Sequence, residues 1–100
     1  MRQNAIFFLV LVLFYLELTL EHLQGRWLSD SNQSISIQNN ICRVNNKRGI
    51  KIIELSDRFT LHGGFTLIKN VKTFKSILWE NPRTLEKVKW TYQGKLTEVT

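Results

Sequence analysis

Few side chains in this 100-residue chain could act as a base or a nucleophile near neutral pH. The candidates are His22, His62 and Cys42. His22 belongs to the segment that is predicted to flank the membrane, and His62 precedes two glycines in a stretch that predicts a tight loop. A catalytic base or nucleophile needs a neighbouring group that orients it, and the sequence around His62 offers none. We therefore predict no catalytic residue and no enzymatic activity.

Metal and cofactor sites are also not predicted. A zinc site requires three or four Cys, His or acidic ligands at a recognisable spacing, which this sequence lacks. Gly63-Gly64 is followed neither by the Lys-Ser/Thr pair nor by the helix of a phosphate-binding loop. A carboxylate pair could form only if the fold brings acidic residues together; the candidates are Asp30, Glu54, Asp57 and Glu80. The sequence thus predicts no cofactor and no metal.

An apolar stretch near the N-terminus determines the predicted location of the rest of the chain relative to a membrane. Twelve apolar residues run without interruption from Ala5 to Leu16, about 18 Å of helix, which suits the core of a secretory signal. Extension to Leu23 gives nineteen residues and about 28 Å, enough to cross a bilayer core of about 30 Å with Glu17 near one interface. Arg2 favours an N-terminus on the cytoplasmic or matrix side.

The cleavage site that a signal peptide requires is poorly matched. A signal peptidase needs small residues at the last and third-last positions, and the nearest match is Leu23 and Gly25 before Arg26. We therefore predict that residues 1–25 form a retained single-pass transmembrane anchor, with a cleaved signal peptide or a soluble core helix as the alternatives. The domain of residues 26–100 is then expected on the non-cytoplasmic (or non-matrix) side of the membrane.

Acidic residues end the apolar stretch. If the helix continues to Gln24, the side chains of Glu17, Glu21 and Gln24 share one face, because their spacings are four and three residues. Glu17 and Glu21 are therefore candidate contacts to a partner helix or a basic loop. A helix end that becomes polar at the membrane interface is the simpler interpretation.

Residues 26–100 are strongly basic. Thirteen Lys and Arg residues against six Asp and Glu residues give this segment a net charge of +7. Such a field attracts lipid head groups, acidic protein surfaces or anionic polymers, with nucleic acid ranked behind these. The candidate contacts to an anionic partner are Lys47, Arg48, Lys51, Lys87 and Lys89.

Two hairpins have a register that the alternation of apolar residues predicts. A three-residue loop, residues 62–64, places only apolar residues opposite one another, namely Leu61 with Phe65 and Phe59 with Leu67. The last hairpin gains an opposite-charge pair when its strands align Glu80 with Lys87, Trp79 with Val88 and Ile77 with Trp90.

Six or seven short strands, spaced by about eight to twelve residues, predict a mainly β fold. We expect an N-terminal hydrophobic helix followed by a small antiparallel meander, closed as a barrel or packed as a sandwich. The lone Cys42 excludes an internal disulfide and is predicted to be a buried thiol, with an intermolecular disulfide as the alternative. The predicted core consists of Trp27, Phe59, Leu61, Phe65, Leu67, Ile77, Trp79, Val88 and Trp90.

Gly25-Arg26-Trp27 resembles the Gly-x-Trp sequence that begins the first strand of lipocalins. The resemblance covers three residues and transfers no site residue to this chain. The 75 residues from Arg26 onward are predicted to be too few for the eight-stranded barrel of that family.

These features favour a non-enzymatic accessory or interaction subunit of a membrane assembly, in which a single-pass anchor carries a basic β-domain. Its expected partners are membrane lipid and other protein subunits. The alternative is a secreted β-domain that binds an anionic polymer or a carbohydrate after signal cleavage near Gly25. Tryptophans interleaved with lysines could stack on sugars or bases, but core packing is the simpler role in so small a domain.

Overall fold

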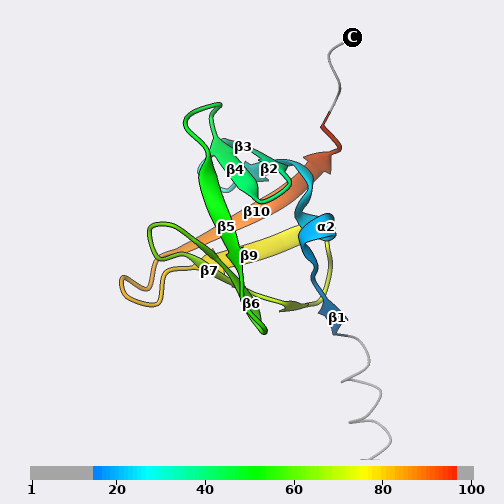
Figure 1. The fold of residues 1–100 in the computed structure, drawn as a ribbon, viewed down its shortest axis with the longest axis vertical. Helices are drawn as coiled ribbons and strands as arrows, with labels where there is room; N and C mark the ends of the chain where they lie inside the picture. Colours follow the sequence, from blue (N-terminus) through cyan, green and yellow to red (C-terminus); the bar gives the residue numbers. More distant parts are fainter. Residues whose placement is uncertain (1–14, 97–100) are drawn as a thin grey trace, which may run out of the picture.

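The computed structural model describes residues 15–96, and these form a closed β-barrel (Figure 1). Eight antiparallel strands follow one another around the barrel in the order β10-β2-β3-β4-β5-β6-β7-β9. Two further strands, β1 and β8, pair with each other. The elements are β1 (Leu16–Glu17), α2 (Leu20–Leu23), β2 (Gly25–Ser29), β3 (Ser34–Gln38), β4 (Ile41–Val44), β5 (Ile50–Glu54), β6 (Arg58–Leu61), β7 (Thr66–Ile68), β8 (Asn70–Val71), β9 (Ser76–Glu80) and β10 (Lys87–Gly94).

The mainly β class is confirmed, and the barrel rather than the sandwich is the architecture. The predicted number of six or seven strands is wrong, because eight strands form the barrel. Eight strands fit because most of them contain only three to five residues and tight turns join them. Asn39 and Asn45 supply turns with positive φ angles of 56° and 53°, a conformation that asparagine tolerates.

Both predicted hairpin registers are confirmed. Phe59 pairs with Leu67, and the Leu61 N–H donates to the Phe65 carbonyl at 2.9 Å. Gly63 and Gly64 both have positive φ, as this loop requires. The last hairpin pairs Glu80 with Lys87, Trp79 with Val88 and Ile77 with Trp90.

The barrel interior contains most of the predicted core. The three tryptophans, together with Phe59, Leu67 and Ile77, are buried, and Leu61, Phe65 and Val88 pack against them half-buried. The core is completed by residues from β3, β4 and β5, namely Ile35, Ile37, Cys42 and Ile52. Cys42 is a free, fully buried thiol, and burial raises its pKa to about 11. The thiol is therefore neutral and protected at physiological pH.

One end of the barrel is closed by residues that were predicted to belong to the transmembrane anchor. Leu18 and Leu23 are 1% and 0% exposed and belong to the core. The indole N–H of Trp27 donates to the Leu23 carbonyl at 2.9 Å, which fixes α2 across this end. His22 stacks on Phe74 with ring centroids 3.8 Å apart. The folded domain therefore includes residues well before Arg26.

The predicted N-terminal hydrophobic helix is not observed in residues 15–25, and residues 1–14 lie outside the described part of the chain. Glu17 belongs to β1 and Glu21 to the four-residue α2. The prediction that they share one face of a continuous helix is therefore wrong, although both side chains are exposed. Between Tyr15 and Leu96, no helical segment has the length and apolar composition that membrane crossing requires.

Candidate functional site

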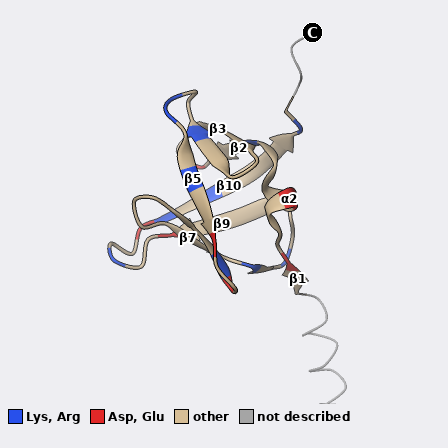
Figure 2. Cartoon of the chain, in the orientation of Figure 1, with Lys and Arg blue, Asp and Glu red and all other residues tan. Residues whose placement is uncertain are grey.

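The five basic candidate residues do not form one surface. Lys47 and Arg48 lie in the β4–β5 loop and Lys51 lies on β5, whereas Lys87 and Lys89 lie on β10. All five are exposed. Because β5 and β10 are four places apart in the ring of eight strands, they occupy opposite sides of the barrel. Figure 2 shows the positive charges spread over several strands and loops.

The acidic candidates are engaged separately and do not make a catalytic pair. The Arg58 guanidinium hydrogen-bonds to Asp57, and this contact lowers the pKa of the Asp57 carboxyl below its ordinary value. Glu54 forms an ion pair with Lys69 at 2.8 Å. His62 is exposed in the β6–β7 loop. Across residues 15–96, no three His, Cys, Asp or Glu side chains are grouped as metal ligands would be.

The barrel is closed between β7 and β9 by a single residue pair. β9 pairs with β10 over five residues, but it pairs with β7 only at Thr66 and Glu80. The Thr66 hydroxyl also donates to the Glu80 carbonyl at 3.3 Å. A continuing ladder would align Ile68 with Leu78, yet the strands separate there. We call this opening the wall window.

The backbone of Leu78 faces the wall window. The Lys89 N–H and carbonyl bind Asp30 on the β2 side, so Lys89 does not hydrogen-bond to its partner Leu78. Adjacent residues of a strand direct their backbone groups to opposite edges. Ile77 therefore bonds to β10, and the N–H and carbonyl of Leu78 point to the opposite edge.

The same alternation applies to β7. The Phe65 carbonyl accepts a hydrogen bond from Leu61, and the Lys69 N–H donates to the Asp57 carbonyl, so both residues bond on the β6 side. Ile68, which directly precedes Lys69, then directs its N–H and carbonyl to the wall window. Among residues 15–96, Ile68 and Leu78 thus have no backbone partner at the edges that face the wall window.

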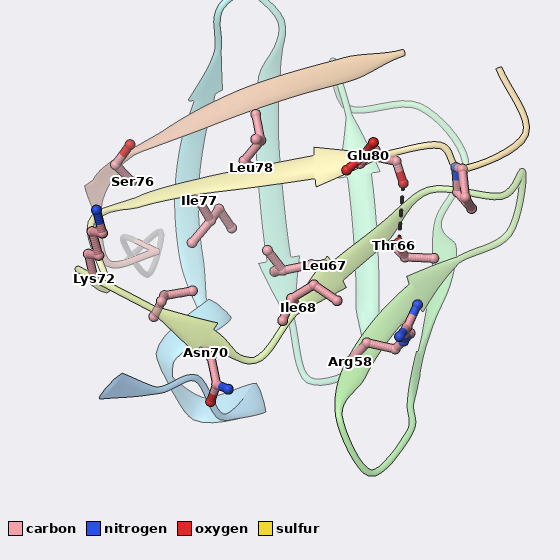
Figure 3. Close-up of a pocket in the computed structure, with 12 residues that line it drawn as sticks. Arg58, Thr66, Leu67, Ile68, Asn70, Lys72, Ser76, Ile77, Leu78 and Glu80 are labelled. Atoms are coloured by element: carbon pink, nitrogen blue, oxygen red, sulfur yellow. Dashed lines mark hydrogen bonds between the residues drawn. The ribbon is translucent and has the colours of Figure 1, made fainter. Parts of the chain in front are cut away.

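The wall window opens into a cavity of about 450 Å³ (Figure 3). In this view β7 and β9 meet near Thr66 and Glu80 and diverge toward Asn70 and Ser76. Ile68 and Leu78 are 47% and 48% exposed, an exposure similar to that of the outward-facing Ile53 on β5, at 49%. The charged residues that line the cavity are Arg58, Lys72 and Glu80.

The wall window exists because the chain changes partner after β7. The Leu18 N–H donates to the Lys69 carbonyl at 2.7 Å, and β8 then pairs with β1 through Leu16 and Val71. β8 therefore pairs with β1, and among residues 15–96 β9 has no strand partner beyond Glu80 on this side. Free strand edges are ready to pair with another chain, and proteins normally cover or disrupt them.

Comparison with protein-family models, curated proteins and solved structures finds no match for this chain. Function must therefore be inferred from the geometry of the barrel and the wall window. Sequence reasoning placed Ile77 and Trp79 inward and so placed Leu78 outward. An outward leucine does not mark a site, because Leu28 and Ile53 are also exposed on other strands, and the sequence therefore held no specific signal for the wall window. The pairing of β8 with β1 gave no signal either, because β1 lies in the segment that was predicted to be the anchor.

Proposed function

We propose that this chain is a non-enzymatic interaction subunit of a membrane assembly and that it binds an extended segment of a partner chain at the wall window. The observation that carries this proposal is that the strand edges at Ile68 and Leu78 have no partner within the described part of the chain. Addition of a strand satisfies exposed backbone groups, and side-chain pockets beside the edge provide specificity. The exposed Ile68 and Leu78 side chains offer apolar contacts to such a segment.

The apolar residues near the N-terminus support a location at a membrane or on its non-cytoplasmic side. Because Leu16 to Leu23 belong to the barrel domain, a nineteen-residue span that ends at Leu23 is incompatible with the folded barrel. The apolar residues that precede the described part are Ala5 to Phe14, and ten residues make about 15 Å of helix, half of a bilayer core. That length suits a signal core, which favours a barrel on the non-cytoplasmic side.

A second candidate, the secreted form, follows from the same length. Cleavage near Gly25 would remove Leu18 and Leu23 from the core, so a cleavage site compatible with this fold lies before Leu18. Mass spectrometry of the mature N-terminus distinguishes the two forms. A mature chain that begins at Arg26 would contradict both, because it lacks the closed end of the barrel.

Substitution of Leu78 by proline tests the interaction. Proline removes the N–H that faces the wall window, and it is tolerated at strand edges because no ladder bond is lost there. We expect Leu78→Pro to lose at least about 90% of the partner recovered with the chain from native membranes, since a strand added at this edge depends on that donor. The matched control, Leu78→Ala, keeps the N–H and is expected to retain the complex with weaker apolar contact.

Thermal unfolding of both variants shows whether the barrel is intact. A folded Leu78→Pro variant that recovers its partner as well as Leu78→Ala does would contradict strand addition at the wall window.

A further inference from the structure

The turn between β2 and β3 contains the one Asn-x-Ser/Thr sequence of this chain. Asn32, Gln33 and Ser34 form it, and none of the seven other asparagines is followed by Ser or Thr two positions later. Such a sequence is the acceptor for N-linked glycosylation when it lies on the surface of a protein outside the cytoplasm. Three residues can match this pattern by chance, so the acceptor groups must also be accessible in the fold.

The β2–β3 turn is held together without the Asn32 side chain. The Ser29 N–H donates to the Gln33 carbonyl at 2.9 Å, and the Ser29 hydroxyl accepts a hydrogen bond from the Gln33 N–H at 2.9 Å. The Asn32 N–H donates to the Ser29 carbonyl, also at 2.9 Å. Asn32 has a positive φ of 64°, a conformation that asparagine tolerates in turns. A modification of the Asn32 amide group therefore breaks no bond that stabilises the turn.

Both reactive groups of the acceptor sequence are accessible. Asn32 and Ser34 are exposed, and within residues 15–96 neither the Asn32 amide group nor the Ser34 hydroxyl forms a hydrogen bond. Other asparagines have structural roles. The Asn45 amide oxygen accepts the Ser34 N–H at 2.9 Å, and the buried Asn81 donates to the Gly63 carbonyl. The fold thus leaves the acceptor asparagine open to a large substituent.

The position of the turn is compatible with binding at the wall window. The turn lies at the barrel end opposite α2, because α2 directly precedes the first residue of β2. In the ring of strands, β10 separates β2 from β9, so the turn is not beside the wall window. A glycan at Asn32 would project from the end of the barrel and leave the wall window accessible to a partner.

We propose that Asn32 is an N-glycosylation site and that the donor substrate is an oligosaccharide carried on a lipid pyrophosphate. In the transfer, the Asn32 amide nitrogen forms a bond to the anomeric carbon of the first sugar and loses one of its two protons. The bond between that carbon and the pyrophosphate oxygen breaks, and the lipid pyrophosphate leaves. The Ser34 hydroxyl is the recognition group of the acceptor. This inference rests on the non-cytoplasmic location in the proposed function, and it is independent of strand addition.

Expression of the full chain in eukaryotic cells, followed by digestion with peptide N-glycosidase, tests the proposal. We expect digestion to increase the electrophoretic mobility of the unaltered chain in a single step. The enzyme converts a glycosylated asparagine to aspartate, and peptide mass spectrometry should find this change at position 32. Ser34→Ala should lose the glycan completely, whereas the matched variant Ser34→Thr keeps the hydroxyl and should retain it. Leu78→Pro should also retain it.

A second acceptor sequence reports the location of the barrel independently. Arg48→Thr places a threonine two residues after Asn46, in the exposed β4–β5 loop. If this variant is glycosylated at Asn46 while Asn32 remains unmodified, the location is correct and the proposal for Asn32 is wrong. If neither asparagine is modified, the non-cytoplasmic location is contradicted as well. A glycan that persists in Ser34→Ala also overturns the assignment to Asn32.

Discussion

Leu23→Ala is expected to lower the free energy of unfolding by about 2–5 kcal/mol. Leu23 is fully buried at the closed end of the barrel, and its carbonyl accepts the Trp27 indole hydrogen bond. Truncation to alanine leaves a cavity beneath α2 that the short helix cannot refill without breaking that bond. Equilibrium denaturation in urea, followed by tryptophan fluorescence, measures the change.

The matched control is Leu28→Ala, on β2. Leu28 is 39% exposed and faces outward, so its truncation is expected to change stability by no more than about 0.5 kcal/mol. Equal and small effects at both positions would show that residues 15–24 are not part of the domain core, and the account of the closed end would be wrong.

Gly25→Ala is expected to have an effect of similar size for a different reason. Gly25 has a φ of +123°, and a Cβ atom there would lie 2.6 Å from the Gly94 carbonyl oxygen. Glycine is therefore required at this position for two reasons. The backbone has a conformation that favours glycine, and β2 lies too close to the end of β10 to leave room for a side chain. Strain at such a position costs about 1–3 kcal/mol, and displacement of β10 adds to it. Thermal unfolding measures the loss.

Gly63→Ala separates the two causes. Gly63 has a similar φ of +115°, but a Cβ atom there meets nothing within 4 Å. The variant is expected to show the conformational cost alone, about 1–3 kcal/mol. If Gly25→Ala is no more destabilising than Gly63→Ala, the close approach of β2 to β10 is not a constraint on the fold.

The features that the sequence predicted correctly depend on local pairing. In the last hairpin, opposite charges at Glu80 and Lys87 and the alternation of Trp79 and Ile77 all require the same register. The loop at residues 62–64 was predicted because only its three-residue form aligns apolar residues. In both cases the pairing partners are less than twenty residues apart, so the pattern itself carries the information.

The features that were not predicted depend on distant contacts. Leu18 and Leu23 continue an apolar stretch, and nothing in that stretch distinguishes a residue buried in lipid from one buried in a barrel. The pairing of β1 with β8 joins residues more than fifty positions apart.

The wall window follows from these distant contacts. β7 could have continued its ladder with β9, and the chain instead turns at Lys69 toward Leu18. Because residues 1–25 were predicted to be a separate anchor, the competition between β9 and the Leu18 segment for the chain after β7 could not be predicted. The site proposed for partner binding is therefore a consequence of the segment that was excluded from the domain.

Hydrogen exchange at the backbone amides of Ile68 and Leu78 tests the central claim most directly. In the isolated chain, both amides are expected to exchange much faster than the neighbouring amide of Ile77, because they face the wall window and have no partner between Tyr15 and Leu96. In native membranes, both are expected to become at least tenfold slower while Ile77 is unchanged. Exchange at Leu78 that is already as slow as at Ile77 in the isolated chain, or equally fast in native membranes, would contradict the account.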